Sequence, residues 1–267
     1  MSGPLLRVQD LTVSFGTPSV PIDVVRGVSF ELEVGQTLGV VGESGSGKSM
    51  TSLAILGLLP KGARVSGSVE FGGEEMLGRS DAWLRARRGD RIGMVFQDPL
   101  SSLHPYYSVG AQIAEAYRAH RRVSAAEARR VAVAAMERVR IRDAAARFDQ
   151  YPHQFSGGMR QRIGIAMALV CEPELLIADE PTTALDVTVQ AQILDLLATV
   201  QEETGIAMLF ITHDLAVISE IADHVLVMQE GVTVESGSAE QIFSDPQHPY
   251  TNRLLDATPR IDEEVAP

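Results

Sequence analysis

Cysteine and lysine are scarce in this 267-residue chain, which has one cysteine, Cys171, and two lysines, Lys48 and Lys61, beside 21 arginines. One thiol excludes an internal disulfide and any zinc or iron–sulfur site built from cysteines of this chain. The longest apolar runs, such as Ile163–Val170, are far below the roughly 18–20 residues of a membrane span. Residues 1–4 lack the charged-then-apolar profile of a secretory signal, so we expect the chain to stay in the cytoplasm.

Acidic residues outnumber basic ones, with 35 Asp and Glu against 23 Lys and Arg and a net charge of −12. An acidic total argues against a general nucleic-acid binder, whose footprint is normally basic. The charge is uneven, because residues 79–162 carry +8, residues 1–78 carry −3 and residues 163–267 carry −17. With 45% hydrophobic and 22% charged residues, the composition is that of a globular chain with one or two domains.

The N-terminal part shows three kinds of pattern. Apolar and polar residues alternate over Leu6–Phe15 and Val28–Val34, which predicts half-buried antiparallel strands. Thr37–Val41 is a short apolar run before a glycine-rich turn, which predicts a buried strand. Helix-like apolar spacing follows over Ser49–Leu58 and stops at Pro60. The predicted order is therefore strand, glycine-rich loop, helix.

The middle third is predicted to be mostly helical. Ser124–Glu127 has the Ser-x-x-Glu form of a capping box, in which each side chain reaches a backbone N–H at a helix start. The apolar residues that follow share one face. They are Ala128, Val131, Ala135, Met136 and Val139. The arginines fall mostly elsewhere, and a solvated basic surface is their simplest interpretation.

The last third returns to alternating β and α patterns. Leu175–Ala178, Met208–Thr212 and Val225–Met228 are strand candidates, and Val187–Thr199 is an amphipathic helix candidate. Such alternation indicates a mainly parallel sheet covered on both faces.

Residues 42–49 fit the phosphate-loop pattern G-x-x-x-x-G-K-[ST]. Glycines let the backbone wrap so that its N–H groups face phosphate oxygens, and the helix start adds partial positive charge. Lys48 is expected to reach the β- and γ-phosphates, and the Ser49 hydroxyl to bind Mg²⁺. The alternative, a chance Gly/Ser turn, does not explain the strand before the loop and the helix after it. The predicted ATP-binding residues here are Gly42, Glu43, Ser44, Gly45, Ser46, Gly47, Lys48, Ser49 and Met50.

The apolar run from Leu175 ends in two acids, Asp179 and Glu180. This arrangement would place Asp179 beside the Mg²⁺ and leave Glu180 able to polarise a water in line with the γ-phosphate. A solvated strand end is the alternative, and the phosphate loop upstream favours the catalytic interpretation.

Between these two motifs, Phe155–Arg162 resembles the signature motif of ATP-binding cassette (ABC) ATPases. Gln97 resembles the glutamine loop of that family, Ala184–Asp186 its D-loop and His213 its switch histidine. These six motifs together are far more specific than any one. The resemblance implies an α/β fold: a phosphate-loop NTPase (RecA-like) core with a mainly parallel sheet, an N-terminal antiparallel β-subdomain and an inserted α-helical subdomain.

The resemblance also implies four segments along the chain. Residues 1–96 would hold the β-subdomain and the first part of the core with the phosphate loop, and residues 97–158 the helical subdomain. Residues 159–238 would complete the core, and residues 239–267 would form a short C-terminal extension with a His-Pro-Tyr motif.

In this family ATP lies between two cassettes arranged head to tail. The phosphate loop of one cassette would face Ser156, Gly157 and Gly158 of the other, whose hydroxyl and backbone N–H groups add donors to the γ-phosphate. Asp186 would link the two sites.

The remaining family roles are carried by single residues. Gln97 would sense Mg²⁺ and the attacking water, so the implied metal ligands are Ser49, Gln97 and Asp179. The catalytic set would be Glu180, His213 and Gln97, and the alternative for His213 is a core histidine. Phe15 resembles the aromatic residue that stacks on adenine, and its alternative is a strand core residue.

Within the family, the chain resembles the D-type ATPase of the oligopeptide/dipeptide/nickel importer group. The segments that carry the resemblance to this group are Gln97–Leu103, Tyr151–Gly158, Ala178–Gln192 and His248–Thr251. Two further segments are closer to the D-type ATPase than to the F-type ATPase paired with it, and these are Ser52–Pro60 and Ile165–Leu169. Departures are His104 in place of the usual Asn, and Phe155 and Met159 in place of Leu and Gln. No cysteine-rich segment follows the His-Pro-Tyr motif before Pro267, so we expect a short-form member or a truncated chain.

The predicted function is that of the ATP-hydrolysing subunit of an ABC importer for peptides, nickel or related small solutes. Its implied partners are two membrane permease subunits and a homologous ATPase subunit, with an extracytoplasmic solute-binding protein acting indirectly. Its implied location is the cytoplasmic face of the inner membrane. Some arginines of the helical subdomain would then assist docking near the anionic leaflet. The candidates are Arg118, Arg121, Arg122, Arg129 and Arg130. The alternative is a non-transport ABC ATPase acting on nucleic acid, but such proteins usually carry insertions or second cassettes that do not fit here.

Overall fold

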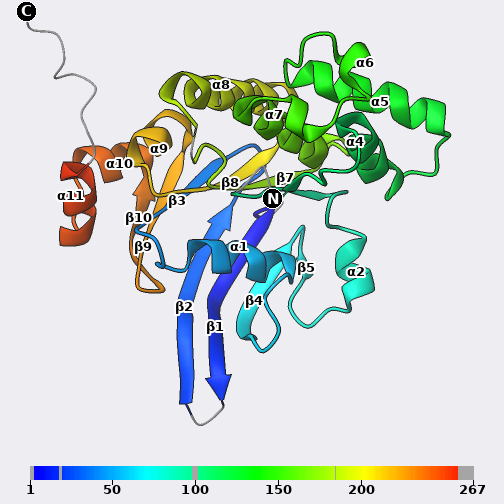
Figure 1. Ribbon diagram of the computed structural model, residues 1–267. Helices are drawn as coiled ribbons and strands as arrows, with labels where there is room; N and C mark the ends of the chain where they lie inside the picture. Colours follow the sequence, from blue (N-terminus) through cyan, green and yellow to red (C-terminus); the bar gives the residue numbers. More distant parts are fainter. Residues whose placement is uncertain (1–2, 18–19, 98–101, 184, 258–267) are drawn as a thin grey trace, which may run out of the picture. The chain divides into compact units, whose positions relative to one another are not determined.

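The computed structural model describes residues 3–17, 20–97, 102–183 and 185–257, which form two compact units (Figure 1). The first unit comprises the described residues of 1–32, 37–77 and 210–267, and the second those of 33–36 and 78–209. The predicted motifs at residues 98–101 and Ala184, and the chain end at Pro267, lie outside the described residues.

The first unit contains two sets of strands and several short helices. Its elements are β1 (Leu6–Thr17), β2 (Val20–Leu32), β3 (Thr37–Val41), α1 (Lys48–Leu56), β4 (Arg64–Phe71), β5 (Glu74–Glu75), α9 (Leu215–Ile221), β9 (His224–Gln229), β10 (Val232–Ser238), α10 (Ala239–Ser244) and α11 (Pro249–Asp256). One set is an antiparallel sheet in the order β2-β1-β4-β5. In the other, β3 runs parallel to β9, and β9 runs antiparallel to β10.

The strand predictions for this unit are confirmed in kind, and several boundaries are corrected. The second strand begins at Val20 rather than Val28. It ends at Leu32 rather than Val34, because a turn in which Gln36 N–H donates to the Glu33 carbonyl at 3.3 Å begins there. Helix α1 ends at Leu56, before the predicted end at Leu58. Gly57 adopts a left-handed conformation, with φ of 62°, and its N–H caps the helix through the Ala54 carbonyl.

The second unit holds most of the helices. Its elements are α2 (Asp81–Arg85), β6 (Ile92–Val95), α4 (Val109–Arg118), α5 (Ala125–Arg138), α6 (Ala144–Arg147), a 3₁₀ turn (Pro152–Gln154), α7 (Gly157–Leu169), β7 (Leu175–Asp179) and α8 (Val187–Thr204). Strand β8 (Ala207–Thr212) begins in this unit and ends in the first. Strands β6 and β7 are parallel, and every residue of β7 is buried, as the apolar run predicts.

Helix α5 begins as the sequence predicts, but its first turn differs from a full capping box. The Ser124 hydroxyl accepts the Glu127 N–H at 3.1 Å, whereas the Glu127 carboxylate binds Arg130 at 2.6 Å. The buried face is centred on Ala128, Ala132 and Met136. Val131 and Ala135, predicted for that face, are only half-buried because they lie at its border.

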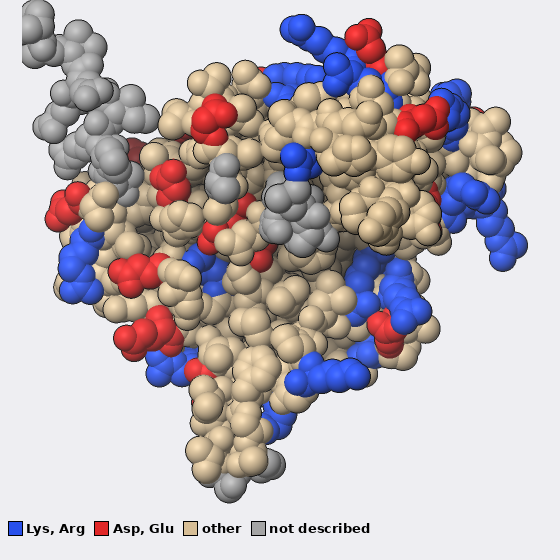
Figure 2. All heavy atoms as spheres, in the orientation of Figure 1, with Lys and Arg blue, Asp and Glu red and all other residues tan. Residues whose placement is uncertain are grey.

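Several arginines of residues 79–162 are paired with carboxylates. Arg121 binds Asp90, and Arg129 binds Asp149 at 3.0 Å. Acidic side chains accordingly lie among the basic ones on the face that Figure 2 shows. The excess positive charge of residues 79–162 is therefore spread over a mixed surface, where exposed ion pairs contribute little to stability.

The described residues contain no helix that is both long and apolar enough to cross a bilayer.

Candidate functional site

The phosphate loop joins β3 to α1 in the order that the sequence predicts. Gly42 has φ of 151°, and a Cβ at this position would lie 2.1 Å from the Met228 carbonyl oxygen. Gly47, with φ of 100°, precedes the first residue of α1, and a Cβ there would lie 2.7 Å from the Val24 carbonyl oxygen. Glycine is required at both ends of the loop, because the backbone turns against neighbouring strands.

Lys48 lies inside this loop with 4% of its surface exposed. Its Nζ donates to the Gly42 carbonyl at 2.7 Å, the Glu43 carbonyl at 2.9 Å and the Ser46 hydroxyl at 3.4 Å. The ammonium group is thus held by neutral oxygens, and an anion entering the loop would be a stronger partner. The outer edge of the loop, Glu43 to Gly45, is exposed.

Phe15 and His213 belong to the same unit as the phosphate loop. His213 follows β8 and is exposed, so its alternative interpretation as a core histidine is wrong. Phe15 is half-buried near the end of β1, opposite Ile22 of β2. Neither side chain is sequestered in the core, and both have surface available for a ligand.

In the second unit, the acidic end of β7 meets Gln97, the residue predicted to sense Mg²⁺ and the attacking water. Glu180 follows the buried Asp179, and its Oε2 accepts a hydrogen bond from Gln97 Nε2 at 2.9 Å. The Thr183 hydroxyl donates to the same oxygen at 2.8 Å. The Glu180 backbone has φ of 48°, a conformation unusual for a non-glycine residue and one found at functional sites. Residues 83 positions apart are therefore brought together around one carboxylate oxygen.

The signature segment forms the N-terminus of α7. The Ser156 hydroxyl caps the helix by accepting the Met159 N–H at 3.4 Å, and both Ser156 and Gly157 are exposed. Phe155 is buried behind them. A Cβ at Gly158 would lie 2.5 Å from Val189 Cγ1 of α8. The segment therefore presents a thirteen-residue helix start to solvent, which favours an anion.

Arg162 and Asp186 connect this helix with its surroundings. The buried Arg162 guanidinium donates to the Val139 carbonyl at 3.1 Å and to Gln192 Oε1 of α8 at 3.0 Å. Burial lowers the pKa of Arg162, with the nearby Arg140 charge adding to the effect. Asp186 caps α8 by accepting the Val189 N–H at 2.9 Å. The capping contact is a structural role that sequence reasoning did not assign to Asp186.

The predicted magnesium ligands all offer oxygen, which is the ligand atom that Mg²⁺ prefers. They are the Ser49 hydroxyl, the Asp179 carboxylate and the Gln97 amide. The amide nitrogen of Gln97 donates to Glu180, and its amide oxygen takes no part in that hydrogen bond. The described residues hold no cluster of three His, Cys, Asp or Glu side chains suited to a metal. By their chemistry, these oxygen donors are of the type that binds a magnesium ion together with phosphates and water.

Sequence reasoning missed two residues that contact the site. Thr183 was seen only as part of a motif, although a hydroxyl three residues after Glu180 can reach back across a turn. Tyr250 was seen only as a group marker, yet its hydroxyl contacts the phosphate loop at Glu43. No local pattern predicts this contact, because 207 residues separate its partners.

Family profiles match two parts of the chain. The profile described as "ABC transporter" matches residues 25–183, and that described as "Oligopeptide/dipeptide transporter, C-terminal region" matches residues 234–266.

Among curated proteins, the chain is similar to ATP-binding proteins of peptide transport. It is 51% identical over 262 residues to the oligopeptide transport ATP-binding protein OppD of Salmonella typhimurium, with 98% of this chain and 78% of that protein covered. It is also 51% identical over 260 residues to the dipeptide transport ATP-binding protein DppD of Bacillus subtilis, covering 97% and 78%.

Two solved structures share the fold. The dimeric, post-hydrolysis ATP-binding cassette MJ0796 bound to ADP and Pi has a TM-score of 0.77 at 26% identity, covering 88% of this chain and 98% of that chain. Clostridium perfringens cbiO1, part of the ABC transporter complex cbiONQ, has a TM-score of 0.76 at 29% identity, covering 91% and 92%. These matches confirm the predicted fold class.

Proposed function

The chain belongs to the ATP-binding cassette transporter family, in its oligopeptide and dipeptide importer group, and on this premise we propose that it powers the uptake of peptides. It is an ATPase subunit of an importer. The observation that carries the proposal is that family profiles match both the cassette and the region around the His-Pro-Tyr motif. In addition, ATP-binding proteins of peptide transport are 51% identical to this chain over 97–98% of its length. Nothing in the comparisons favours the nucleic-acid alternative.

We assign the nucleotide to the phosphate loop. Lys48 would bind the β- and γ-phosphates, while loop N–H groups face the same oxygens. Phe15 would stack on the adenine. Mg²⁺, held by Ser49, Gln97 and Asp179, would supply charge neutralisation at the phosphates.

Glu180 is the proposed general base of the reaction. Its carboxylate is held by the side chains of Gln97 and Thr183, so it is oriented before a water arrives. It would accept the proton of the water that attacks the γ-phosphate. The exposed His213 would contact the γ-phosphate as a hydrogen-bond donor.

The second half of each ATP site is proposed to come from a partner cassette. Ser156, Gly157 and Gly158 would supply the hydroxyl and helix-start N–H groups that bind the γ-phosphate in the partner's phosphate loop. Their support is the exposed start of α7, since the first N–H groups of a helix have no partner within the helix backbone. Asp186, at the start of α8, would link the two sites. ATP would then hold the two cassettes together, and hydrolysis would release them.

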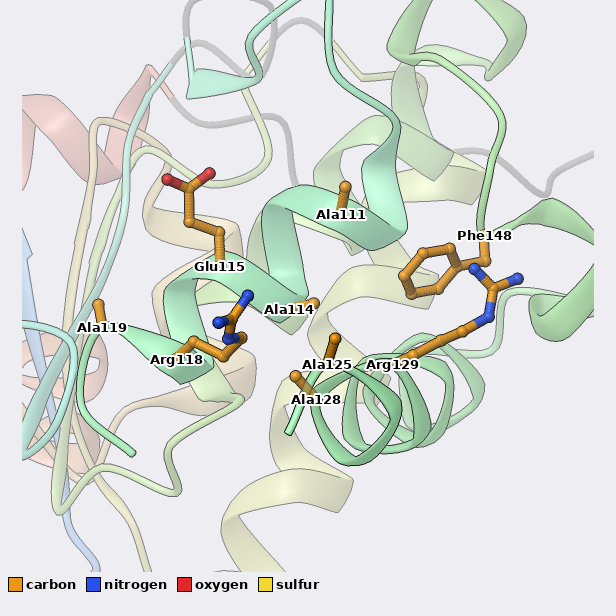
Figure 3. A pocket seen from close by; sticks show the side chains of 9 residues that line it. All are labelled: Ala111, Ala114, Glu115, Arg118, Ala119, Ala125, Ala128, Arg129 and Phe148. Carbon is orange, nitrogen blue, oxygen red and sulfur yellow. The ribbon is translucent and has the colours of Figure 1, made fainter. Parts of the chain in front are cut away.

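We propose a groove in the helical region as the contact for a permease subunit. The groove has a volume of about 700 Å³ and is lined by α4, α5 and the Phe148 ring (Figure 3). Its walls are mainly small alanine side chains, and Arg129 stacks on Phe148 with its guanidinium carbon 3.9 Å from the ring centre. Glu115 and Arg118 project from α4 beside it. A short helix with an apolar face and charged flanks fits such a lining.

The proposed location is the cytoplasmic face of the inner membrane, in a complex of two permeases and a homologous ATPase. An extracytoplasmic binding protein would deliver the peptide, so the peptide would not touch this chain. The test is purification of the tagged full chain from membranes, with identification of its partners, together with uptake of a labelled peptide by cells with and without the chain. Copurifying permeases and chain-dependent uptake are expected. Unchanged peptide uptake, or tight binding of DNA or RNA at physiological salt, would overturn the proposal.

A further inference from the structure

The His-Pro-Tyr motif makes a direct contact with the phosphate loop. The Tyr250 hydroxyl accepts a hydrogen bond from the Glu43 backbone N–H at 2.9 Å. Tyr250 has only 2% of its surface exposed, and both residues belong to the first unit. Burial raises the pKa of Tyr250, so the phenol is neutral at physiological pH and its oxygen serves as a hydrogen-bond acceptor.

Each residue of the motif has a separate task in placing this hydroxyl. His248 precedes α11, and its Nδ1 accepts the Tyr250 N–H at 3.2 Å, which caps the helix. Pro249 is the first helical residue, where its missing N–H costs nothing and its fixed φ favours the helix. Tyr250 is then the first residue of α11 with an N–H, and its side chain is directed into the protein.

The start of α11 is itself tied to β10. The Glu235 carboxylate of β10 accepts the backbone N–H groups of Gln247 at 2.7 Å and His248 at 3.1 Å. Burial opposes the ionisation of Glu235, but these N–H groups and the neighbouring Thr251 hydroxyl outweigh it, so the pKa of Glu235 is lowered. A charged acceptor thus holds the segment that carries Tyr250.

The peptide groups on either side of Glu43 link this anchor to the phosphate-binding lysine. The N–H of Glu43 is bound to Tyr250, and its carbonyl accepts both Ser46 N–H at 3.2 Å and Lys48 Nζ at 2.9 Å. The hydrogen bonds of Glu43 in this network all involve its backbone N–H and carbonyl, so the backbone transmits the constraint. The contact lies at the exit from β3, where the chain leaves a fully buried strand and begins the turn of the loop.

We propose that Tyr250 is a positioning residue that holds the phosphate loop in its nucleotide-binding conformation, so that the His-Pro-Tyr region tunes ATP affinity from outside the cassette motifs. The inference rests on the proposed assignment of ATP to the phosphate loop. Without the hydroxyl, the Glu43 peptide can rotate, and part of the ATP-binding free energy is used to restore the loop.

The test compares three variants of the full-length chain with the wild type. Tyr250→Phe removes only the hydroxyl, and Tyr106→Phe makes the same change at a site with 82% of its surface exposed. Lys48→Ala removes the phosphate-binding ammonium group. The measurements are the Kd for a fluorescent ATP analogue, KM and kcat for ATP hydrolysis, and the melting temperature. Hydrogen exchange of the Glu43 amide is measured in wild type and in Tyr250→Phe.

Tyr250→Phe is expected to raise Kd and KM about three- to tenfold, the effect of one hydrogen bond, with kcat changed less than about twofold. Its Glu43 amide should exchange faster than in wild type, and Tyr106→Phe should behave as wild type. A lowered melting temperature with unchanged Kd would show a merely structural role and overturn the proposal. Rapid exchange of the Glu43 amide in the wild-type chain would also overturn the proposal, because it would show that the Tyr250 hydroxyl does not hold this N–H. If Lys48→Ala binds ATP normally, the assignment of ATP to this loop fails. If Lys48→Ala loses binding while Tyr250→Phe binds normally, only the role of Tyr250 fails.

Discussion

Replacing Thr183 with valine tests whether the catalytic carboxylate needs the support that the structure gives it. Glu180 Oε2 accepts two hydrogen bonds, one from Thr183 at 2.8 Å and one from Gln97 at 2.9 Å. Valine keeps the shape and volume of threonine but removes the hydroxyl. The carboxylate then loses one of the two side-chain donors seen at Oε2, on a residue whose backbone φ of 48° leaves it in a sparsely populated conformation.

The size of the effect follows from the type of bond. A hydrogen bond to a charged group contributes about 1.5–3 kcal/mol, and both Thr183 and Glu180 are half-buried, so we take the lower end, about 1.5 kcal/mol. If that positioning energy is lost in the transition state, kcat falls about tenfold, because each 1.36 kcal/mol is about a factor of ten in rate. ATP binding should change little, since Thr183 is not among the residues assigned to the phosphates.

Phosphate release by the purified chain at saturating ATP measures kcat, and a fluorescent ATP analogue measures Kd. Thr183→Ser is the matched control, because it keeps a hydroxyl on the same carbon and should retain most of the activity. A kcat for Thr183→Val within about twofold of wild type, or above it, would refute the positioning argument. Equal losses in the serine and valine variants would assign the effect to packing of the threonine methyl group.

Three further substitutions test the other assignments. Glu180→Gln should bind ATP normally but lower turnover by orders of magnitude, because it removes the general base and leaves the phosphate-binding residues unchanged. Near-normal phosphate release would contradict the assignment of Glu180 as the base. Ser156→Arg should leave nucleotide binding to this chain's own loop unchanged but impair ATP-dependent pairing with a second cassette, measured by size-exclusion chromatography; normal pairing would count against the head-to-tail arrangement. Ala114→Trp should fill the groove between α4 and α5 and reduce copurification of permeases at least severalfold, whereas Ala126→Trp, exposed on α5 outside the groove, should not; equal recovery from both would place the permease elsewhere.

Local patterns in the sequence were sufficient for the elements that hold the motifs. Thr37–Val41 and Leu175–Asp179 are buried strands because each contains a short apolar run, Leu38–Val41 or Leu175–Ala178, and such a run must be covered on both faces. The glycines at positions 42 and 47 indicate a turn that only they can adopt. In these places the residue types alone restrict the backbone to one conformation, and the family motifs add the chemistry.

Local patterns were less informative for short elements and for the choice between two possible side-chain partners. Strand β5, with two residues, and helix α10, with six, escaped prediction because each has too few residues for a period to show. The eight-residue β4 was not predicted either. Glu127 was expected to bind its own helix start and instead binds Arg130, because a guanidinium is a stronger partner for a carboxylate than a backbone N–H.

The sequence by itself therefore determined the fold class, the family and the order of the motifs, because these depend on residue types at short, regular spacing. Only the tertiary structure decided which distant groups meet: Gln97 with Glu180, and Tyr250 with the phosphate loop at Glu43. It also decided that His213 is exposed and that several arginines of residues 79–162, such as Arg121 and Arg129, are paired with acids. The physical reason is that a hydrogen bond between residues 83 or 207 positions apart depends on how strands and helices pack. Neither partner carries a local signal of the other.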